Sequence, residues 1–192
     1  MQLPTFPARP VNGGRLELAR PKFGPWAFEP KVNGWRALYH RPSRTLWNRH
    51  GEPLSIASEF QTALRVLDAI AFIDLFDLEA LERRHDLMRG CLFVLDVVIP
   101  DASYSVRRAL MEKHFPVFAT VHAHAWRDQC SILKSSNWSN AAVAYKQLCA
   151  ANKILKCPFY EGVVAKRTDK PYPIQNRDPK CECPFWMKHR FL

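Results

Sequence analysis

The segment EPKVNGWR, residues 29 to 36, holds one lysine in a setting suited to covalent chemistry. Pro30 disfavours helix at the residue before it, so the chain reaches Lys31 in an extended conformation. Gly34 lets the backbone turn or approach a ligand closely, which places Lys31 at a strand end beside a loop. A lysine is a nucleophile only as the neutral amine, and neighbouring cations or a bound metal favour that form by lowering its pKa. We therefore interpret Lys31 as a candidate nucleophile.

Cations and carboxylates that could serve such a nucleophile follow much later in the chain. They are the cations Lys166, Lys188 and Arg190 and the carboxylates Glu79 and Glu161. Carboxylates beside phosphate-binding cations are what a magnesium-dependent phosphoryl or nucleotidyl transfer site requires. Each piece alone is weak, because Glu79 could be an edge-strand surface residue and Trp186 a core residue. Their order and spacing together favour the transfer site.

The hydrophobic pattern indicates the elements that must position these residues. Two strands are expected within residues 34–55, joined by a turn at Pro42 and Ser43. The other expected strands are 71–81, 91–100, 116–126, 160–167 and 184–191, and the expected helices are 58–70, 103–115 and 138–154. Ser58, and either Ser103 or Ser105, are candidate helix N-caps. Because strands and helices alternate without a regular βαβ rhythm, we predict an α+β fold with antiparallel sheets.

Length and composition are typical of a folded, basic protein. The 192 residues suit one domain with a proper core, and the 47% hydrophobic content excludes a disordered chain. We expect residues 1–17 to form an extended arm and residues 18–192 to form the domain. Lys and Arg number 28 against 18 Asp and Glu, and the net charge of +10 favours a polyanion such as nucleic acid as partner. A merely soluble basic protein is the alternative.

Nothing in the sequence indicates a membrane protein or an exported one. No apolar run approaches the roughly 18 residues that span a bilayer, and the N-terminal MQLPTFPARPVNGG lacks the apolar region of a signal peptide. The six cysteines are therefore expected to be reduced thiols in the cytoplasm. Cys181 and Cys183 form a CxC pair, but a structural zinc needs about four ligands and no second tight pair exists, so we expect no zinc site.

Five motifs, in order along the chain, resemble those of one enzyme family. Lys31 to Arg36 is similar to K-x-D-G-x-R, and Glu161 to Lys166 is similar to E-G-[VL]-[VM]-x-K. The other three are Arg49-His50-Gly51, Asp77-Leu78-Glu79 and Trp186 to Arg190, the last similar to W-x-K-x-K. From about Leu18 onward the chain resembles the nucleotidyltransferase domain of ATP-dependent DNA ligases, in the superfamily that includes RNA ligases and mRNA capping enzymes. The resemblance implies two packed antiparallel sheets flanked by helices, in an ATP-grasp-like arrangement.

The resemblance also implies a role for each motif residue. Lys31 would attack the α-phosphate of ATP to form a lysyl-AMP, while Lys166 and Lys188 grip that phosphate. Glu161 and Glu79 would hold Mg²⁺ or Mn²⁺. Glu29 would read the adenine amino group, Glu79 would contact the ribose, and Arg36 and Arg49 would hold ribose and phosphates. The further ATP-binding positions implied are Val32, Phe93, Leu95, Trp186 and Arg190.

Several features depart from the family pattern. Asn33 stands where Asp is usual, which keeps an oxygen but loses the charge. Leu95 stands where an aromatic ring usually stacks on adenine, and Phe93, two residues earlier on the same strand face, could replace it. Arg190 replaces the second lysine of the last motif and keeps the charge. Similar enzymes continue into an OB-fold domain where this chain ends, so the arm or a partner protein would have to replace that domain.

The function implied is ATP-dependent sealing of 5′-phosphate and 3′-hydroxyl ends in nicked duplex DNA. RNA or an RNA–DNA hybrid is the alternative substrate, because the motifs are less specific for the polymer than for the superfamily. A GTP-using capping enzyme fits less well with the sequence EPK around the lysine. A non-catalytic nucleic-acid-binding remnant is a further alternative, which the intact Lys31, Glu161, Lys166 and Lys188 disfavour.

Overall fold

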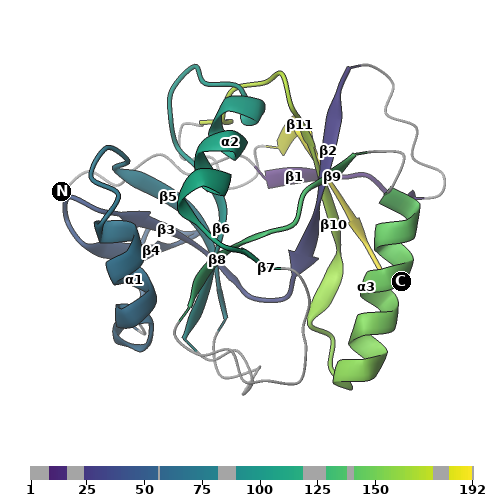
Figure 1. Ribbon diagram of the computed structural model, residues 1–192, viewed down its shortest axis with the longest axis horizontal. Helices are drawn as coiled ribbons and strands as arrows, with labels where there is room; N and C mark the ends of the chain where they lie inside the picture. The colour runs from purple at the N-terminus through teal and green to yellow at the C-terminus, as the bar shows by residue number, and fades with distance from the viewer. Residues whose placement is uncertain are drawn as a thin grey trace.

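Two β-sheets and three α-helices form the part of the chain that the structure describes (Figure 1). The structure is a computed structural model, and it describes residues 9–16, 24–55, 57–81, 90–118, 129–137, 141–174 and 182–191. The helices are α1 (Gln61–Asp68), α2 (Tyr104–His114) and α3 (Ala141–Leu155). The predicted α+β class is confirmed.

The strands form one five-stranded and one six-stranded sheet. The five-stranded sheet contains, in spatial order, β1 (Arg9–Asn12), β11 (Glu182–Arg190), β10 (Tyr160–Arg167), β2 (Trp26–Val32) and β9 (Ser136–Asn137). The six-stranded sheet contains β4 (Thr45–Asn48), β3 (Trp35–His40), β5 (Leu75–Leu81), β6 (Cys91–Val97), β8 (Cys130–Leu133) and β7 (Val117–Phe118). The strand predicted over 116–126 is described only as β7, because residues 119–128 lie outside the described ranges.

The expectation of antiparallel sheets holds only in part. Three neighbouring pairs run parallel: β1 with β11, β6 with β8, and β7 with β8. Parallel neighbours need a crossover connection of roughly a dozen residues or more. Helix α2 lies in the connection that follows β6 and packs against β6, so the chain returns through β7 and β8 in the parallel direction.

Each sheet buries its outer face beneath helices (Figure 1). Helices α1 and α2 cover the six-stranded sheet, and Phe60, Leu64 and Leu67 are buried there. Helix α3 covers the five-stranded sheet, where Ala141 packs with Phe28 and Val163. No helix among the described residues is both long enough and apolar enough to cross a membrane.

The two helix-capping predictions had different outcomes. The Ser103 side chain accepts a hydrogen bond from the Val106 backbone N–H at the start of α2, which confirms that N-cap. The prediction of Ser58 was wrong. A 3₁₀ turn over Ala57–Phe60 precedes α1 and includes Ser58, so the residue at the N-cap is Phe60, which offers no side-chain acceptor.

A two-residue link, Asn33 and Gly34, carries the chain from β2 in one sheet to β3 in the other. The Asn33 N–H donates to the carbonyl of Phe159, just before β10, at 2.8 Å. The Gly34 N–H donates to Oε1 of Glu79, on β5, at 3.0 Å. A Cβ at position 34 would lie 2.8 Å from the carbonyl oxygen of Ala80, so the glycine is required by lack of space. The backbone N–H groups of Asn33 and Gly34 thus form hydrogen bonds to different sides of the domain, one next to the five-stranded sheet and one in the six-stranded sheet.

The described part of the N-terminal segment belongs to the five-stranded sheet. Strand β1 is its edge strand, with Asn12 opposite Lys188, and the Gly13 N–H donates to the carbonyl of Lys188 at 3.0 Å. Residues 1–8 of the predicted arm lie outside the described residues. The domain boundary between residues 17 and 18 stays a prediction.

Candidate active site

Lys31 forms an ion pair that joins strands β2 and β10. Its Nζ lies 2.5 Å from Oε2 of Glu161, and the two side chains are 20% and 27% exposed. Lys31 stands opposite Gly162 across the β2–β10 pair, and Gly162 stands opposite Arg190 across the β10–β11 pair. The register of three neighbouring strands therefore brings the predicted nucleophile, one predicted metal ligand and one predicted cation together.

Two cations of β11 complete this cluster. Nε of Arg190 lies 3.5 Å from the same Glu161 oxygen. Burial and then the charge of Arg190 lower the pKa of Lys188, and the charges of Lys31 and Arg9 act in the same direction. Lys31 and Arg190 thus share one carboxylate, and Lys188 lies near both cations, an excess of positive charge that suits phosphate oxygens.

The strand pairing beside Lys31 depends on Gly162. Its φ is +146°, and a Cβ there would lie 1.9 Å from the carbonyl oxygen of His189. No other residue type fits between β10 and β11 at this point. The glycine of the EGVVAK motif therefore has a structural reason that is independent of any ligand.

Arg36 and Glu79 reach the same region from the six-stranded sheet, where they stand opposite each other on β3 and β5. Burial raises the pKa of Glu79 to about 7, although the charges of Lys31 and Arg36 oppose the rise. Arg36 donates from Nε and Nη2 to the two carboxylate oxygens of Asp77, at 3.0 and 2.7 Å. Its guanidinium also lies 5.4 Å from the centre of the Trp186 ring.

Glu29 and Lys166 lie deeper, in a buried network between the sheets. The Glu29 carboxylate is 4% exposed, and its Oε2 lies 2.8 Å from Nζ of Lys166. Its Oε1 accepts from Nη1 of Arg108 at 2.9 Å and from the Tyr104 hydroxyl at 2.5 Å. Burial and the neighbouring Glu29 charge raise the pKa of Tyr104, which keeps its hydroxyl protonated as a donor.

Aromatic rings enclose the Lys166 ammonium. Nζ lies 5.0 Å from the centre of the Trp186 ring and 5.2 Å from that of Tyr104, and it donates to the Leu95 carbonyl at 2.5 Å. Trp186 is itself 3% exposed and packs edge to face against Tyr172. Trp186 is therefore both a core residue and a neighbour of two predicted site cations, Lys166 and Arg36.

The predicted ATP-binding residues Val32, Phe93 and Leu95 belong to one apolar cluster. Phe93 is buried and meets Phe118 edge to face, with ring centres 5.1 Å apart. Leu95 is half-buried against the same cluster. In this arrangement the Phe93 ring is engaged with other rings, and its role as a stacking partner for adenine stays a prediction.

Arg49 lies apart from these contacts. It is exposed in the turn after β4, and its Nε donates to Nε2 of the neighbouring His50 at 3.0 Å. The structure does not bring Arg49 into the network around Lys31 or Glu29, among the contacts of the described residues. Its predicted role toward ribose or a nucleic-acid phosphate stays a prediction.

Solved structures share this arrangement of sheets and helices, whereas no family model and no curated protein sequence matches the chain. The ligase domain of M. tuberculosis LigD has 20% identity and a TM-score of 0.58 over 97% of this chain and 59% of that one. A mycobacterial DNA ligase D complexed with ATP and MES has 19% identity and a TM-score of 0.57, over 97% and 60%. An archaeal ATP-dependent RNA ligase has 16% identity and a TM-score of 0.60, over 97% and 48%.

The chain has the nucleotidyltransferase-domain fold of ATP-dependent ligases. It spans less than two thirds of the length of each of these three structures. DNA and RNA ligases match to a similar degree, so the nucleotidyltransferase fold by itself does not distinguish the two nucleic acids.

Three residues of this nucleotidyltransferase fold take part in the buried network but escaped sequence reasoning: Tyr104, Arg107 and Arg108. Arg107 donates to both carboxylate oxygens of Asp96, at 2.7 and 3.0 Å, and is fully buried. The pair of adjacent arginines within helix 103–115 was no clear signal, because neighbouring helical positions about 100° apart can both face solvent. The partners of these residues lie in other motifs, so their roles could not be assigned from spacing.

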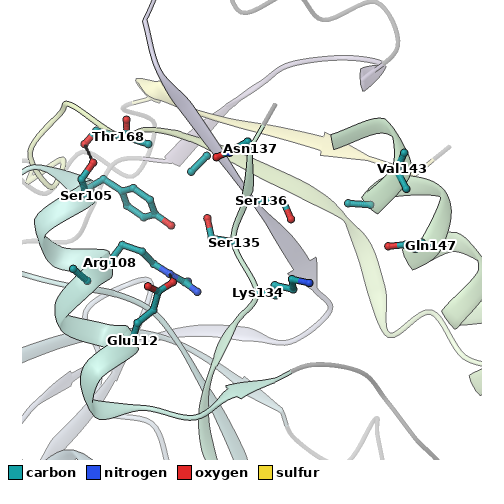
Figure 2. Close-up of a pocket in the computed structure, with 14 residues that line it drawn as sticks. Ser105, Arg108, Glu112, Lys134, Ser135, Ser136, Asn137, Val143, Gln147 and Thr168 are labelled. Atoms are coloured by element: carbon teal, nitrogen blue, oxygen red, sulfur yellow. Dashed lines mark hydrogen bonds and ion pairs between the residues drawn. The ribbon is translucent and has the colours of Figure 1, made fainter. Parts of the chain in front are cut away.

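A polar pocket of about 670 Å³ lies between α2 and α3 of the nucleotidyltransferase fold (Figure 2). Ala27, near the start of β2, and Thr168, just after β10, line it, whereas Lys31 and Gly162 lie toward the opposite ends of these strands. The pocket is therefore separate from the Lys31 cluster. Arg108 connects the pocket with the buried network around Glu29, because it lines the pocket and also binds Glu29.

A magnesium ion is compatible with the carboxylates present. The described residues contain no group of three or more His, Cys, Asp or Glu side chains suited to a metal. Magnesium needs no such group when it binds one or two carboxylates together with substrate phosphates. Glu161, partly exposed, and Glu79 offer these carboxylates, and their assignment stays a prediction. Of the CxC pair, Cys183 is buried and Cys181 lies outside the described residues.

Proposed function

We propose that the protein is an ATP-dependent polynucleotide ligase that works through a lysyl-AMP intermediate on Lys31. The observation that carries this proposal is the contact of Lys31 with Glu161 at 2.5 Å, beside Lys188 and Arg190, at the link between two sheets. The nucleotidyltransferase fold of known ATP-dependent ligases supports it. ATP is the first substrate.

In the first step the neutral Nζ of Lys31 attacks the α-phosphorus of ATP. A P–N bond forms, the bond from that phosphorus to the oxygen bridging the β-phosphate breaks, and pyrophosphate leaves. Lys31 loses one proton before the attack and another as the bond forms, and Oε2 of Glu161 is within reach to accept a proton. The cations Lys188 and Arg190 stabilise the negative charge that accumulates on the phosphate oxygens.

The next two steps join the nucleic-acid ends. An oxygen of a 5′-phosphate attacks the phosphorus of lysyl-AMP, the P–N bond breaks, and Lys31 regains its protons. A 3′-hydroxyl oxygen then attacks the phosphorus of the activated 5′ end, its proton is released, and AMP leaves. A bound magnesium ion would neutralise phosphate charge during these transfers, held by Glu161 and Glu79.

The other predicted residues surround these reacting groups in the proposal. Lys166 would join Lys188 on the α-phosphate, Glu29 would read the adenine amino group, and Glu79 would contact the ribose. Arg36, fixed by Asp77, would hold the ribose and phosphates from the six-stranded sheet. Arg49, exposed and outside the buried network, would meet the 5′-phosphate of the nucleic acid.

Nicked duplex DNA is the proposed second substrate. The net charge of +10 favours a polyanion, and LigD structures share the fold. RNA is the second candidate, favoured by the likeness to an archaeal ATP-dependent RNA ligase. A partner protein or the basic N-terminal segment would help to enclose the nucleic acid, and we place the reaction in the cytoplasm, where the cysteines would stay reduced.

The test is to incubate the protein with ATP or GTP and magnesium or manganese and to weigh the intact chain. We expect a gain of one AMP with ATP only, mapped to Lys31. The charged protein is then mixed with nicked duplexes of DNA, RNA and hybrid strands, and the sealed product is measured. A chain that gains no nucleotide mass under any of these conditions would instead support the non-catalytic nucleic-acid-binding alternative.

A further inference from the structure

The two carboxylate oxygens of Glu29 have different partners. Oε1 is held by Arg108 and Tyr104, which both come from α2. Oε2 is held by Lys166, at 2.8 Å. A long, flexible lysine side chain can leave this contact while the two partners of Oε1 keep the carboxylate oriented.

The Lys166 ammonium is bound to Glu29 and not to the cluster around Lys31, where the proposed chemistry takes place. Lys166 stands opposite Ala27, four residues along β10 from Gly162, which pairs with Lys31. Four residues of strand correspond to about 14 Å. In the structure the ammonium lies between Tyr104 and Trp186, and its side chain is 3% exposed. A role at the α-phosphate therefore requires Lys166 to leave Glu29.

The acidic groups around Lys166 remain compensated when it leaves. Glu29 keeps Arg108 and Tyr104. Asp96, 3.7 Å from Lys166, keeps the two hydrogen bonds from Arg107. The departure thus leaves two acceptors without their lysine donor, Oε2 of Glu29 and the Leu95 carbonyl, and one cation that needs a new anion. An unpaired buried acceptor is costly, so the exchange requires a replacement donor.

The amino group of adenine is such a donor, and a triphosphate supplies the anion. Guanine presents a carbonyl oxygen at the corresponding position, which would face the carboxylate without a hydrogen. We propose that Lys166 occupies, on Glu29, the place that the adenine amino group takes when ATP binds, so that base recognition releases Lys166 to the α-phosphate. The inference rests on the proposed function and deepens it, because it couples the choice of base to the rate of phosphate chemistry.

The test compares two nucleotides on the unmodified protein. ATP and purine riboside triphosphate, which carries hydrogen in place of the 6-amino group, are each given at saturating concentration, and AMP or its analogue on Lys31 is followed by intact mass. We expect the maximum rate to be at least about tenfold lower with the analogue, since one lost phosphate donor costs roughly 10²–10³ in comparable sites. Equal maximum rates, with a difference only in the half-saturating concentration, would overturn the inference.

Two variants distinguish Lys166 from a general loss of charge. In Lys166→Met both nucleotides should react slowly and at equal maximum rates. In the matched control Lys188→Met both should react slowly, but the ratio between them should match that of the unmodified protein. If the Lys166→Met protein kept the same ratio of maximum rates as the unmodified protein, the exchange of Lys166 for the adenine amino group would be contradicted. Failure of the unmodified protein to label Lys31 with either nucleotide would reject the proposed function itself, a result distinct from equal rates.

Discussion

Lys31 and Glu161 contact each other across strands β2 and β10, with 2.5 Å between Nζ and Oε2. The cations Lys188 and Arg190 lie on the strand beyond, β11, and Arg190 reaches the same carboxylate oxygen. The contact therefore holds the candidate nucleophile in place, and it must loosen before the amine can attack.

Replacing Lys31 with alanine should abolish AMP labelling and change stability little. The side chain is 20% exposed, and partly exposed ion pairs contribute only about 0–1 kcal/mol. Intact mass after ATP treatment and a urea unfolding curve measure the two effects. Lys153→Ala, an exposed lysine on α3, is the matched control and should label normally. If AMP were found on another lysine of the Lys31→Ala protein, Lys31 would not be the nucleophile.

Glu79 should make the folded protein less stable as the pH rises from about 4.5 to about 7. Its pKa is raised in the folded state to about 7 from 4.5, so the folded state binds the proton more tightly, and that stabilisation is lost as the carboxyl ionises. Glu79→Gln cannot ionise. The free energy of unfolding of the variant relative to the unmodified protein should therefore increase between pH 4.5 and pH 8, by up to roughly 3 kcal/mol. A difference that is constant with pH would contradict the raised pKa.

Gly162→Ala should unfold the domain or destabilise it by more than about 3 kcal/mol, because its Cβ would lie 1.9 Å from the His189 carbonyl oxygen. Gly14→Ala is the matched control. Gly14 also has a positive φ, +68°, but nothing lies within 4 Å of a Cβ there, so the cost should be only about 1–2 kcal/mol. Thermal unfolding of both variants measures the difference. Similar losses of stability would show that the positive φ, and not the lack of space for a Cβ, determines the cost of the substitution.

Binding to a nicked duplex should weaken steeply with salt. The net charge of +10 implies phosphate contacts, and log affinity falls by about 0.9 per contacted phosphate for each decade of salt. Titrations of a fluorescent nicked duplex at several salt concentrations give the slope. In Arg49→Ala the slope should decrease by about 1, because the exposed Arg49 is the proposed contact of the 5′-phosphate. Affinity that is flat with salt would argue against a phosphate-binding surface.

Deleting residues 1–17 should slow sealing of a pre-adenylylated nick and lower the melting temperature. The deletion removes β1 and leaves β11, the strand of Lys188, as an exposed sheet edge. A single-turnover sealing assay and a thermal scan compare the truncated and full chains. Rapid sealing by the truncated chain would mean that the N-terminal segment is not needed for the joining step.

The sequence predicted the residues around Lys31 better than those around Glu29, for a physical reason. Lys31, Glu161 and Arg190 lie in strands with clear patterns, and the pairing of neighbouring strands brings them together. Glu29 instead depends on Tyr104 and Arg108, which are 75 and 79 residues away on a helix. Lys31 and Glu161 are farther apart, by 130 residues, but both belong to motifs of the family that the sequence resembles, whereas Tyr104 and Arg108 belong to none of them. The sequence also did not predict that β8 pairs in parallel with β6, because this direction depends on how α2 packs.

The two-residue link at Asn33 and Gly34 joins the two sheets beside the candidate site, so the site is complete only when both sheets have formed and packed together. Lys31 and Glu161 belong to one sheet, whereas Arg36 and Glu79 belong to the other. A chain in which only one sheet has formed contains half of these groups and cannot bind a nucleotide between them. Acquisition of AMP by Lys31 during refolding would therefore report the moment at which the two halves of the domain dock, and not the formation of either half.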